Sequence, residues 1–333
     1  MKIVFLRLDK IGDLIATLPA DQSLEGTASD HQVHWVVAKG LGWICKVADP
    51  ERQFLELDLT KPKESRKILE QFLKAEKPDL IINFYAPWWA SFAAWKARVL
   101  QRVGRRSQWH SYLFFNRGLR QSRSLAEKHE ADYNQELVDF ALQRSPQKTP
   151  ILHLNPPTKR HLFEKFNLSP GQYFIVHPGM AGSALNWPQE KYNSLIEKLV
   201  LLGPVVITGT KSDDPYLTEI KPLWQHHQKV RFLQNQLSME DLLSLLKSAK
   251  AVVAPSTGVL HLAASLGVRS IGIYSPVRVH RALRWGPRGT QSQSLTPKVD
   301  CPATDQCLKE RCPHHPCMES ISVDEVMKGL GLS

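Results

Sequence analysis

The stretch AVVAPSTGVLHLAASLG, residues 251–267, decides the fold class. A valine-rich apolar run passes through a turn of small residues into a short apolar helical pattern, which a glycine closes. A buried strand that leads through a tight turn into a helix is typical of βαβ units, from which parallel sheets are built. The stretch therefore predicts an α/β protein.

Similar short apolar runs recur along the chain, with helical patterns between them. The predicted strands are residues 3–8, 33–38, 80–84, 173–176, 205–208, 230–233, 251–254 and 270–274. Residues 145–157 carry four prolines and neither periodicity, so we interpret them as a linker. A length of 333 residues suits two domains. We predict Rossmann-like domains over residues 1–150 and 151–333, with ligands bound at the carboxyl ends of their strands.

The charge of the chain is strongly positive and unevenly distributed. The formal net charge is +11, and residues 91–130 hold nine lysines and arginines against two glutamates. Such a segment favours an anionic partner, although it also suits a solvated loop and helix face. No nucleic-acid-binding signature accompanies the charge, so we expect a phosphorylated lipid or sugar and no nucleic acid. The candidate contacts are Lys10, Arg105, Arg120 and Arg123.

The apolar runs are too short for a membrane protein. None approaches the roughly 18–20 uninterrupted apolar residues that a membrane span requires. The first ten residues, MKIVFLRLDK, are also too charged for a secretory signal. We therefore expect a cytoplasmic protein.

The first predicted strand ends in a polar turn with one glycine and one carboxylate, Gly12 and Asp13. Glycine allows the backbone to approach a ligand closely, and a carboxylate at this edge of the sheet can accept a proton from an attacking hydroxyl group. The alternative is that Asp13 only caps the helix that follows. Asp9 and Lys10 share the turn.

Two loops in the second half have the composition of phosphate or ribose sites. HPGMAGSALNWP, residues 177–188, follows a strand and offers His177, Gly179, Ser183 and Asn186 as contacts. Thr208 ends another strand, and Asp213 in the following turn suits a ribose diol. Structural turns are the alternative interpretation of both loops.

The opening stretch gives the most specific pattern. Thr257 and Gly258 would begin its helix, so their amides and the helix dipole favour a diphosphate. His261 lies one helical turn further on the same side and could donate to a phosphate oxygen. Ser256 precedes them. The chain has no GxxxxGK[ST] motif, which argues against a P-loop nucleotidase.

Taken together and in this order, these segments resemble glycosyltransferase family 9, the bacterial lipopolysaccharide heptosyltransferases. The likeness extends over nearly the whole chain. It rests on RLDKIGD at 7–13, HPG at 177–179, NWP at 186–188, STGVLHLAA at 256–264, YSP at 274–276 and RWGP at 284–287.

The resemblance implies a GT-B fold, with two Rossmann-like domains facing a central cleft. It implies an inverting transfer without metal or cofactor, from ADP-L-glycero-D-manno-heptose to an inner-core lipopolysaccharide acceptor at the inner membrane surface. Asp13 matches the general base, and residues 257–261 match the donor-phosphate site. Gly12 and the loop residues named above are assigned to the donor, and the basic candidates to the acceptor. Leu185 and Ser256 depart from the pattern, where many members have a basic residue and an aspartate.

Two alternative functions stay open at this point. One is a nucleotide-sugar 2-epimerase, which shares the two-domain architecture, although the turn at Asp13 and the segment at His261 favour transfer. The other is a catalytically silent glycolipid-binding protein, to which Leu185 and Ser256 lend weight.

Four of the five cysteines crowd the tail, namely Cys301, Cys307, Cys312 and Cys317, with His314 and His315 among them. Their spacing fits structural zinc sites poorly, and disulfides would be unexpected in a reducing cytoplasm. Packing or a disulfide, a structural zinc ion, and redox control all stay open. Cys45 stands alone in an apolar stretch and is expected in the core.

Overall fold

The computed structural model describes residues 1–24, 31–180, 182 and 184–332. The chain divides into two compact units. Unit 1 comprises Met1–Arg123 and Lys128–Leu154, and unit 2 comprises Ser124–Glu127 and Asn155–Ser333. Each unit closes around its own buried core.

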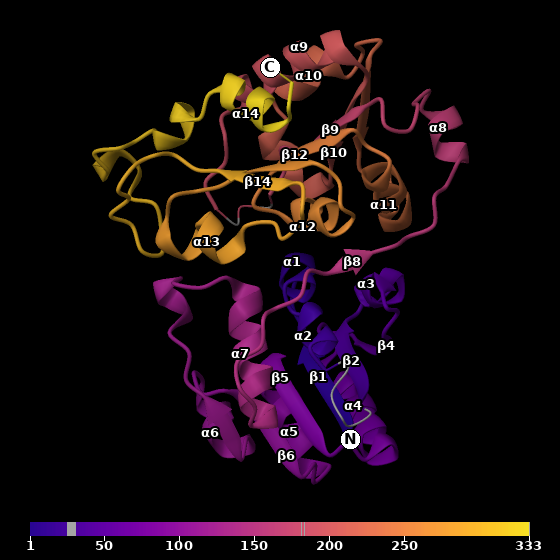
Figure 1. Ribbon diagram of the computed structural model, residues 1–333, viewed down its shortest axis with the longest axis vertical. Coiled ribbons are helices and arrows are strands. Elements are labelled where there is room, and N and C mark those ends of the chain that lie inside the picture. Colours follow the sequence, from indigo (N-terminus) through magenta and orange to yellow (C-terminus); the bar gives the residue numbers. More distant parts are fainter. Residues whose placement is uncertain (25–30, 181, 183, 333) are drawn as a thin grey trace. The chain divides into compact units, whose positions relative to one another are not determined.

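Unit 1 alternates strands with helices along the chain (Figure 1). Its strands are β1 (Lys2–Arg7), β2 (Gln32–Ala38), β3 (Ala48–Asp49), β4 (Gln53–Leu57), β5 (Leu80–Tyr85), β6 (Gln101–Arg105), β7 (Arg117–Leu119) and β8 (His153–Leu154). Its helices are α1 (Ile11–Ile15), α2 (Pro19–Gln22), α3 (Gly42–Val47), α4 (Pro62–Glu76), α5 (Trp88–Lys96), α6 (Trp109–Phe114) and α7 (Glu130–Leu142).

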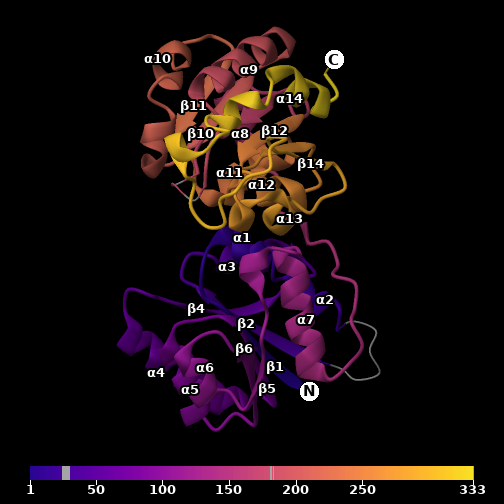
Figure 2. The same cartoon turned by 90° about the vertical axis from the view of Figure 1, so that its left-hand side faces the viewer.

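The main sheet of unit 1 is parallel throughout, with the strand order β4-β2-β1-β5-β6-β7. Alternate side chains of its strands point to opposite faces. Val4 and Leu6 of β1 enter one core together with Leu69 of α4 and Ala93 of α5. Figure 2 shows α4 and α5 on this face, and α2 and α7 on the other. Burial on both faces explains why the central strands are continuous apolar runs.

Unit 2 repeats this alternation. Its strands are β9 (Phe174–Val176), β10 (Val205–Gly209), β11 (Val230–Gln234), β12 (Ala251–Pro255), β13 (Ser270–Ile273) and β14 (Ser292–Leu295). Its helices are α8 (His161–Lys165), α9 (Gln189–Leu202), α10 (Ile220–Trp224), α11 (Met239–Lys247), α12 (Gly258–Ser265), α13 (Ala282–Trp285) and α14 (Val323–Gly329). Helices α9, α10 and α14 share one core with the sheet, and α11 and α12 lie on its opposite side (Figure 1).

The two main sheets have the same strand order. In unit 2 it is β11-β10-β9-β12-β13-β14, again with parallel neighbours. Counted within each unit, both orders are the 3-2-1-4-5-6 of the Rossmann fold. The predicted fold class is therefore confirmed. In such sheets the strand order reverses between the first and fourth strands, here β1 beside β5 and β9 beside β12, and ligands bind at the carboxyl ends there.

The predicted strands all exist, within one or two residues at their ends. The strands β4, β6, β7 and β14 lie toward the sheet edges and escaped prediction because their sequences are polar, for example QRVGR in β6. Residues 153–154 of the predicted linker pair with β3 in unit 1. Among the residues described above, no helix combines the length and the apolar character needed to cross a bilayer.

Candidate active site

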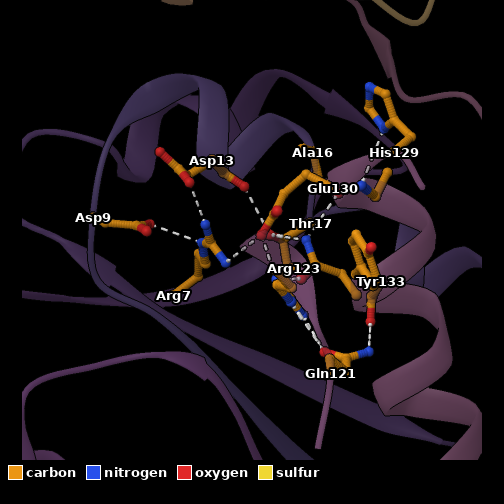
Figure 3. Close-up of polar contacts among 12 residues, drawn as sticks. Arg7, Asp9, Asp13, Ala16, Thr17, Gln121, Arg123, His129, Glu130 and Tyr133 are labelled. Carbon is orange, nitrogen blue, oxygen red and sulfur yellow. Dashed lines mark hydrogen bonds and ion pairs between the residues drawn. The ribbon is translucent and has the colours of Figure 1, made fainter. Parts of the chain in front are cut away.

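Asp13 lies in the first turn of α1, directly after the carboxyl end of β1. Arg7, the last residue of β1, is almost fully buried, and its guanidinium reaches both carboxylates of the turn. Nε donates to Asp9 Oδ1 at 2.8 Å, and Nη2 donates to Asp13 Oδ1 (Figure 3). The Asp13 side chain is 21% exposed, so this carboxylate is anchored and still open to solvent. Lys10 is the exposed N-cap residue of α1.

A second arginine, Arg123, is connected to Arg7 through Glu130. Glu130, in the first turn of α7, lies 4.0 Å from Arg7 Nη1 and pairs with Arg123. Arg123 also donates to Asn134 Oδ1 at 3.0 Å and to Gln121 Oε1 at 2.7 Å. These contacts link β1, α7 and the segment that follows β7 into one polar network, of which Figure 3 labels Arg7, Gln121, Arg123 and Glu130.

Arg123 was predicted to contact the acceptor, and the structure gives it another position. It is 4% exposed, and its guanidinium is engaged by the internal partners just described. Burial lowers the pKa of Arg123 to about 9, although Glu130 opposes the shift. Arg123 is therefore placed to hold Glu130. Arg105 ends β6, and the exposed Arg120 follows β7 at the same edge of the sheet, where an acceptor contact stays a prediction.

The network of unit 1 has more carboxylates than guanidinium groups. Asp9, Asp13 and Glu130 face Arg7 and Arg123, so one negative charge is in excess if all of them are ionised. Burial raises the pKa of Asp9 to about 7 although Arg7 opposes the shift, and repulsion by Asp13 adds to it. The pKa of Arg7 is raised, because the three carboxylates outweigh the effect of its burial. Protonation of Asp9 would remove the excess negative charge, which is the direction in which its pKa is shifted.

In unit 2, the predicted donor residues gather at the carboxyl ends of β9 and β10. His177 follows β9, and its Nδ1 lies 2.9 Å from Thr208 Oγ1 of β10. Both side chains are buried. Burial lowers the pKa of His177 to about 4, although Asp213 acts in the opposite direction. His177 is therefore neutral at pH 7 and serves as a hydrogen-bonding group, not as a cation.

Gly179 and Asp213 are in close contact. A Cβ atom on Gly179 would lie 2.1 Å from Cγ of Asp213, so only glycine allows the loop to pass this side chain. Asp213 is buried, and its Oδ2 accepts from the amide and the hydroxyl of Thr210, both at 2.8 Å. The aspartate thus holds the turn after β10 in place, and a ribose contact stays a prediction.

Asn186 fixes the shape of the loop after β9. Its Nδ2 donates to the carbonyl of Pro178 at 2.6 Å, and its Oδ1 accepts from the amide of Trp187 and the hydroxyl of Tyr192. Leu185, where the family pattern often has a basic residue, is partly buried and packs against the core of unit 2. The predicted contact Ser183 lies outside the described residues.

The helix α12 begins where the opening stretch predicts it. Thr257 is its N-cap residue, in extended conformation, and its side chain makes no capping hydrogen bond within the described chain. The amides of Gly258 and Val259 precede the first intrahelical bond, so they are suited to an anion. Ser256 hydrogen-bonds the phenol of Tyr274. His261 is buried in the same helix.

The tail cysteines are free, half-buried thiols. Burial raises the pKa of Cys317, and Cys301, Cys307 and Cys312 lie near enough to add to the shift. Over the described ranges, no three His, Cys, Asp or Glu side chains are grouped in a way that could hold a metal ion. Cys45 is fully buried, as expected for a core residue.

Sequence reasoning did not identify Arg7 and Glu130 as a supporting network. A signal for Arg7 was present, because it is the one charged residue within the apolar run from Ile3 to Leu8. A charge inside a buried strand requires a partner, and the turn that follows supplies two. Glu130 gave no comparable charge pattern, since it stands in the mixed polar segment HEADYN at residues 129–134, which is only a weak likeness to the family pattern.

Comparison with known proteins gives consistent results. Residues 66–311 match the model of glycosyltransferase family 9 (heptosyltransferase). A putative glycosyltransferase of Haemophilus influenzae is 30% identical over 86% of both chains. Lipopolysaccharide heptosyltransferase 1 of Escherichia coli is 24% identical over 83% of this chain and 88% of its own length.

Solved structures support the same fold. A family 9 glycosyltransferase from Veillonella parvula superimposes with a TM-score of 0.81 at 19% identity, covering 100% of this chain and 97% of the other. ADP-heptose lipopolysaccharide heptosyltransferase II of Escherichia coli gives 0.78 at 18% identity, covering 99% and 98%. The fold is accordingly GT-B. By sequence match and by fold, the chain belongs to glycosyltransferase family 9 and is a glycosyltransferase.

Proposed function

We propose that the enzyme transfers heptose from ADP-heptose to an inner-core lipopolysaccharide acceptor, with inversion and without a metal ion. Family membership favours this transfer over the epimerase and silent-binder alternatives. The choice of donor and acceptor class is supported by the names of similar proteins, a lipopolysaccharide heptosyltransferase 1 and an ADP-heptose lipopolysaccharide heptosyltransferase II, both of Escherichia coli. The reaction is assigned to the cytoplasm, with peripheral contact at the inner membrane where a lipid acceptor resides.

The observation that carries the proposal is the Arg7-anchored carboxylate of Asp13 at the carboxyl end of β1. One oxygen of Asp13 is held by Arg7, while Oδ2 has no hydrogen-bond partner in the described part of the chain. Oδ2 would take the proton of the acceptor hydroxyl group while the oxygen of that hydroxyl group attacks the anomeric carbon of the donor sugar. The bond between the anomeric carbon and the diphosphate oxygen breaks on the opposite face, which inverts the configuration.

The leaving nucleoside diphosphate needs stabilisation without a metal ion. We assign this role to the amides of Thr257, Gly258 and Val259 and to the dipole of α12, with His261 as a further donor. Gly12, Ser256 and the loop residues His177, Gly179, Ser183, Asn186, Thr208 and Asp213 are assigned to the donor side. Lys10, Arg105 and Arg120 are assigned to the anionic acceptor. Arg123 acts through Glu130 instead.

The test measures ADP release and product mass with ADP-heptose and heptose-free lipopolysaccharide core. The Asp13→Asn enzyme should lose transfer by about 10²- to 10⁴-fold, because the amide cannot accept the proton. Asp79→Asn is the matched control, since Asp79 precedes β5 and binds the amide of Lys2 at 2.8 Å. Full transfer by Asp13→Asn would refute the base assignment. Transfer only from another nucleotide sugar would refute the donor.

A further inference from the structure

Helices α5 and α6 of unit 1 carry an exposed aromatic surface. We define it by Trp88, Phe92 and Trp95 of α5 and Trp109, Tyr112 and Leu113 of α6. Trp109 is 62% exposed and Leu113 is 65% exposed. Large apolar side chains that gather on one surface, in contrast to single ones, mark an interaction site.

The rings of Trp88, Phe92, Trp95 and Trp109 form a continuous cluster with Phe114. The ring centroids of Trp88 and Trp109 lie 6.4 Å apart, which joins the two helices. The ring centroid of Phe92 lies 5.7 Å from that of Trp95 and 5.6 Å from that of Phe114 in α6. The opposite side of α5, with Trp89, Ala90, Ala93 and Ala94, is buried in the core of unit 1. Helix α5 is therefore apolar on both sides, and the sheet covers only one of them.

A buried polar chain fixes α6 against α5. Ser91 of α5 accepts from Asn83 of β5 at 3.2 Å and lies 3.2 Å from His110 Nδ1 of α6. His110 Nε2 lies 2.6 Å from Oε1 of Gln108, at the start of the helix. The aromatic surface is thus a preorganised part of the fold, and its exposure does not come from a frayed end.

The surroundings of the aromatic surface are basic. Residues 80–126, which include α5 and α6, contain eight lysines and arginines and no aspartate or glutamate. Of these eight, Arg123 is buried, and Lys96 pairs with Glu70 of α4, as does Arg66. Arg66 lies over the Phe92 ring at 5.6 Å, and Arg106 lies over the Tyr112 ring at 5.9 Å. Tryptophan, tyrosine and arginine side chains together match the headgroup region of an anionic bilayer. A second copy of this chain would bring two basic surfaces together, which disfavours self-association.

We propose that the aromatic surface docks unit 1 onto an anionic phospholipid bilayer. The rings of Trp88, Trp95 and Trp109 insert at the headgroup level, while the basic side chains around them face the lipid phosphates. The inference deepens the proposed function, on which it rests for a glycolipid acceptor, and it names the face that would bring the enzyme to that lipid.

Docking is tested by sedimentation of the whole protein with vesicles. One vesicle type contains equal parts of phosphatidylcholine and phosphatidylglycerol, and the other contains phosphatidylcholine alone. The protein should bind the anionic vesicles more tightly, and added salt should weaken binding. The double variant Trp109→Ser with Leu113→Ser should bind at least about tenfold more weakly, since it removes one inserted ring and the exposed apolar side chain one helical turn further along α6.

The matched control is the double variant Leu201→Ser with Leu223→Ser, which removes exposed apolar side chains from α9 and α10 of unit 2. It should bind vesicles like the unaltered protein. Equal weakening by both double variants would overturn the proposal. Unchanged vesicle binding by the α6 variant would also overturn it. The same holds if the unaltered protein does not bind vesicles but forms a dimer that the α6 substitutions dissociate.

A second measurement separates docking from catalysis. The α6 variant should lose transfer to acceptor embedded in vesicles and keep its kcat/KM for a core oligosaccharide without lipid. If the protein transfers no heptose to either acceptor, the proposed function fails, and vesicle binding still decides the docking surface. Loss of transfer to both acceptors by the α6 variant alone would contradict a docking role.

Discussion

Replacing Arg7 with methionine tests whether the buried arginine positions Asp13. The change removes the partner of two carboxylates and leaves Asp9, Asp13 and Glu130 with Arg123 as their remaining guanidinium in the network of Figure 3. The Nε–Oδ1 distance of 2.8 Å to Asp9 corresponds to about 6 kcal/mol of attraction at an effective dielectric constant of about 20. The original desolvation of Arg7 offsets part of this attraction, so we expect a net loss of about 3–5 kcal/mol in the free energy of unfolding.

The same change should reduce catalysis beyond its effect on stability. Without Arg7 the Asp13 carboxylate has lost its anchor, and a displacement of about 1 Å costs roughly a hundredfold in rate. We expect this loss in kcat, with little change in the KM for donor. The Arg7→Lys enzyme keeps the positive charge, but an ammonium group cannot donate to both carboxylates as the planar guanidinium does. Its kcat should therefore lie between those of the unaltered enzyme and Arg7→Met.

The matched control is Arg52→Met. Arg52 is buried in unit 1 and pairs with Asp21 at 2.7 Å and 2.8 Å, separate from the candidate site. Urea unfolding should show a similar loss of stability in both methionine variants, while ADP release at saturating donor should fall specifically in Arg7→Met. The reasoning is refuted if Arg7→Met and Arg52→Met have the same kcat at a temperature at which both are folded, because Arg7 would then contribute to stability alone.

Two further predictions follow from the two units. Burial raises the pKa of Asp9 to about 7 from 3.8, so its contribution to stability is fully present below about pH 4 and is lost as the pH rises through 7. The Asp9→Asn protein should lack this slope in urea midpoints measured between pH 4 and pH 8, and an unchanged slope would contradict the burial argument. The Gly179→Ala enzyme should lose about 1–3 kcal/mol of stability and show a raised donor KM, because its new Cβ would meet the carboxylate of Asp213. Gly171→Ala is the control: it costs about 1 kcal/mol for its left-handed backbone, its Cβ meets no neighbour, and its donor KM should stay unchanged.

The sequence predicts the interior of each sheet better than its edges. Strands such as β5 and β12 are buried on both faces, and this burial requires the uninterrupted apolar runs by which they are recognised. The outer strands β6 and β14 have polar side chains because part of their surface is exposed. Their pairing is set by the neighbouring strand, which a local pattern does not reveal.

The same distinction applies to the candidate site. Asp13 and Thr257 could be proposed from the sequence because they follow strands, and parallel sheets bring such positions to one edge. The environment of Asp213, Asn186 and Arg123 was not predictable, since each side chain bonds to a partner that the fold supplies. Residue type and position in the sequence alone do not distinguish a side chain that contacts a ligand from one that bonds to another part of the protein.

Each unit of this enzyme closes its own core around its own copy of the same strand order. These two cores share no residue, so a buried substitution in one core removes no packing contact within the other. Under the proposed division, with the acceptor on unit 1 and the donor on unit 2, a change in preference for one substrate does not require repacking of the core that supports the other.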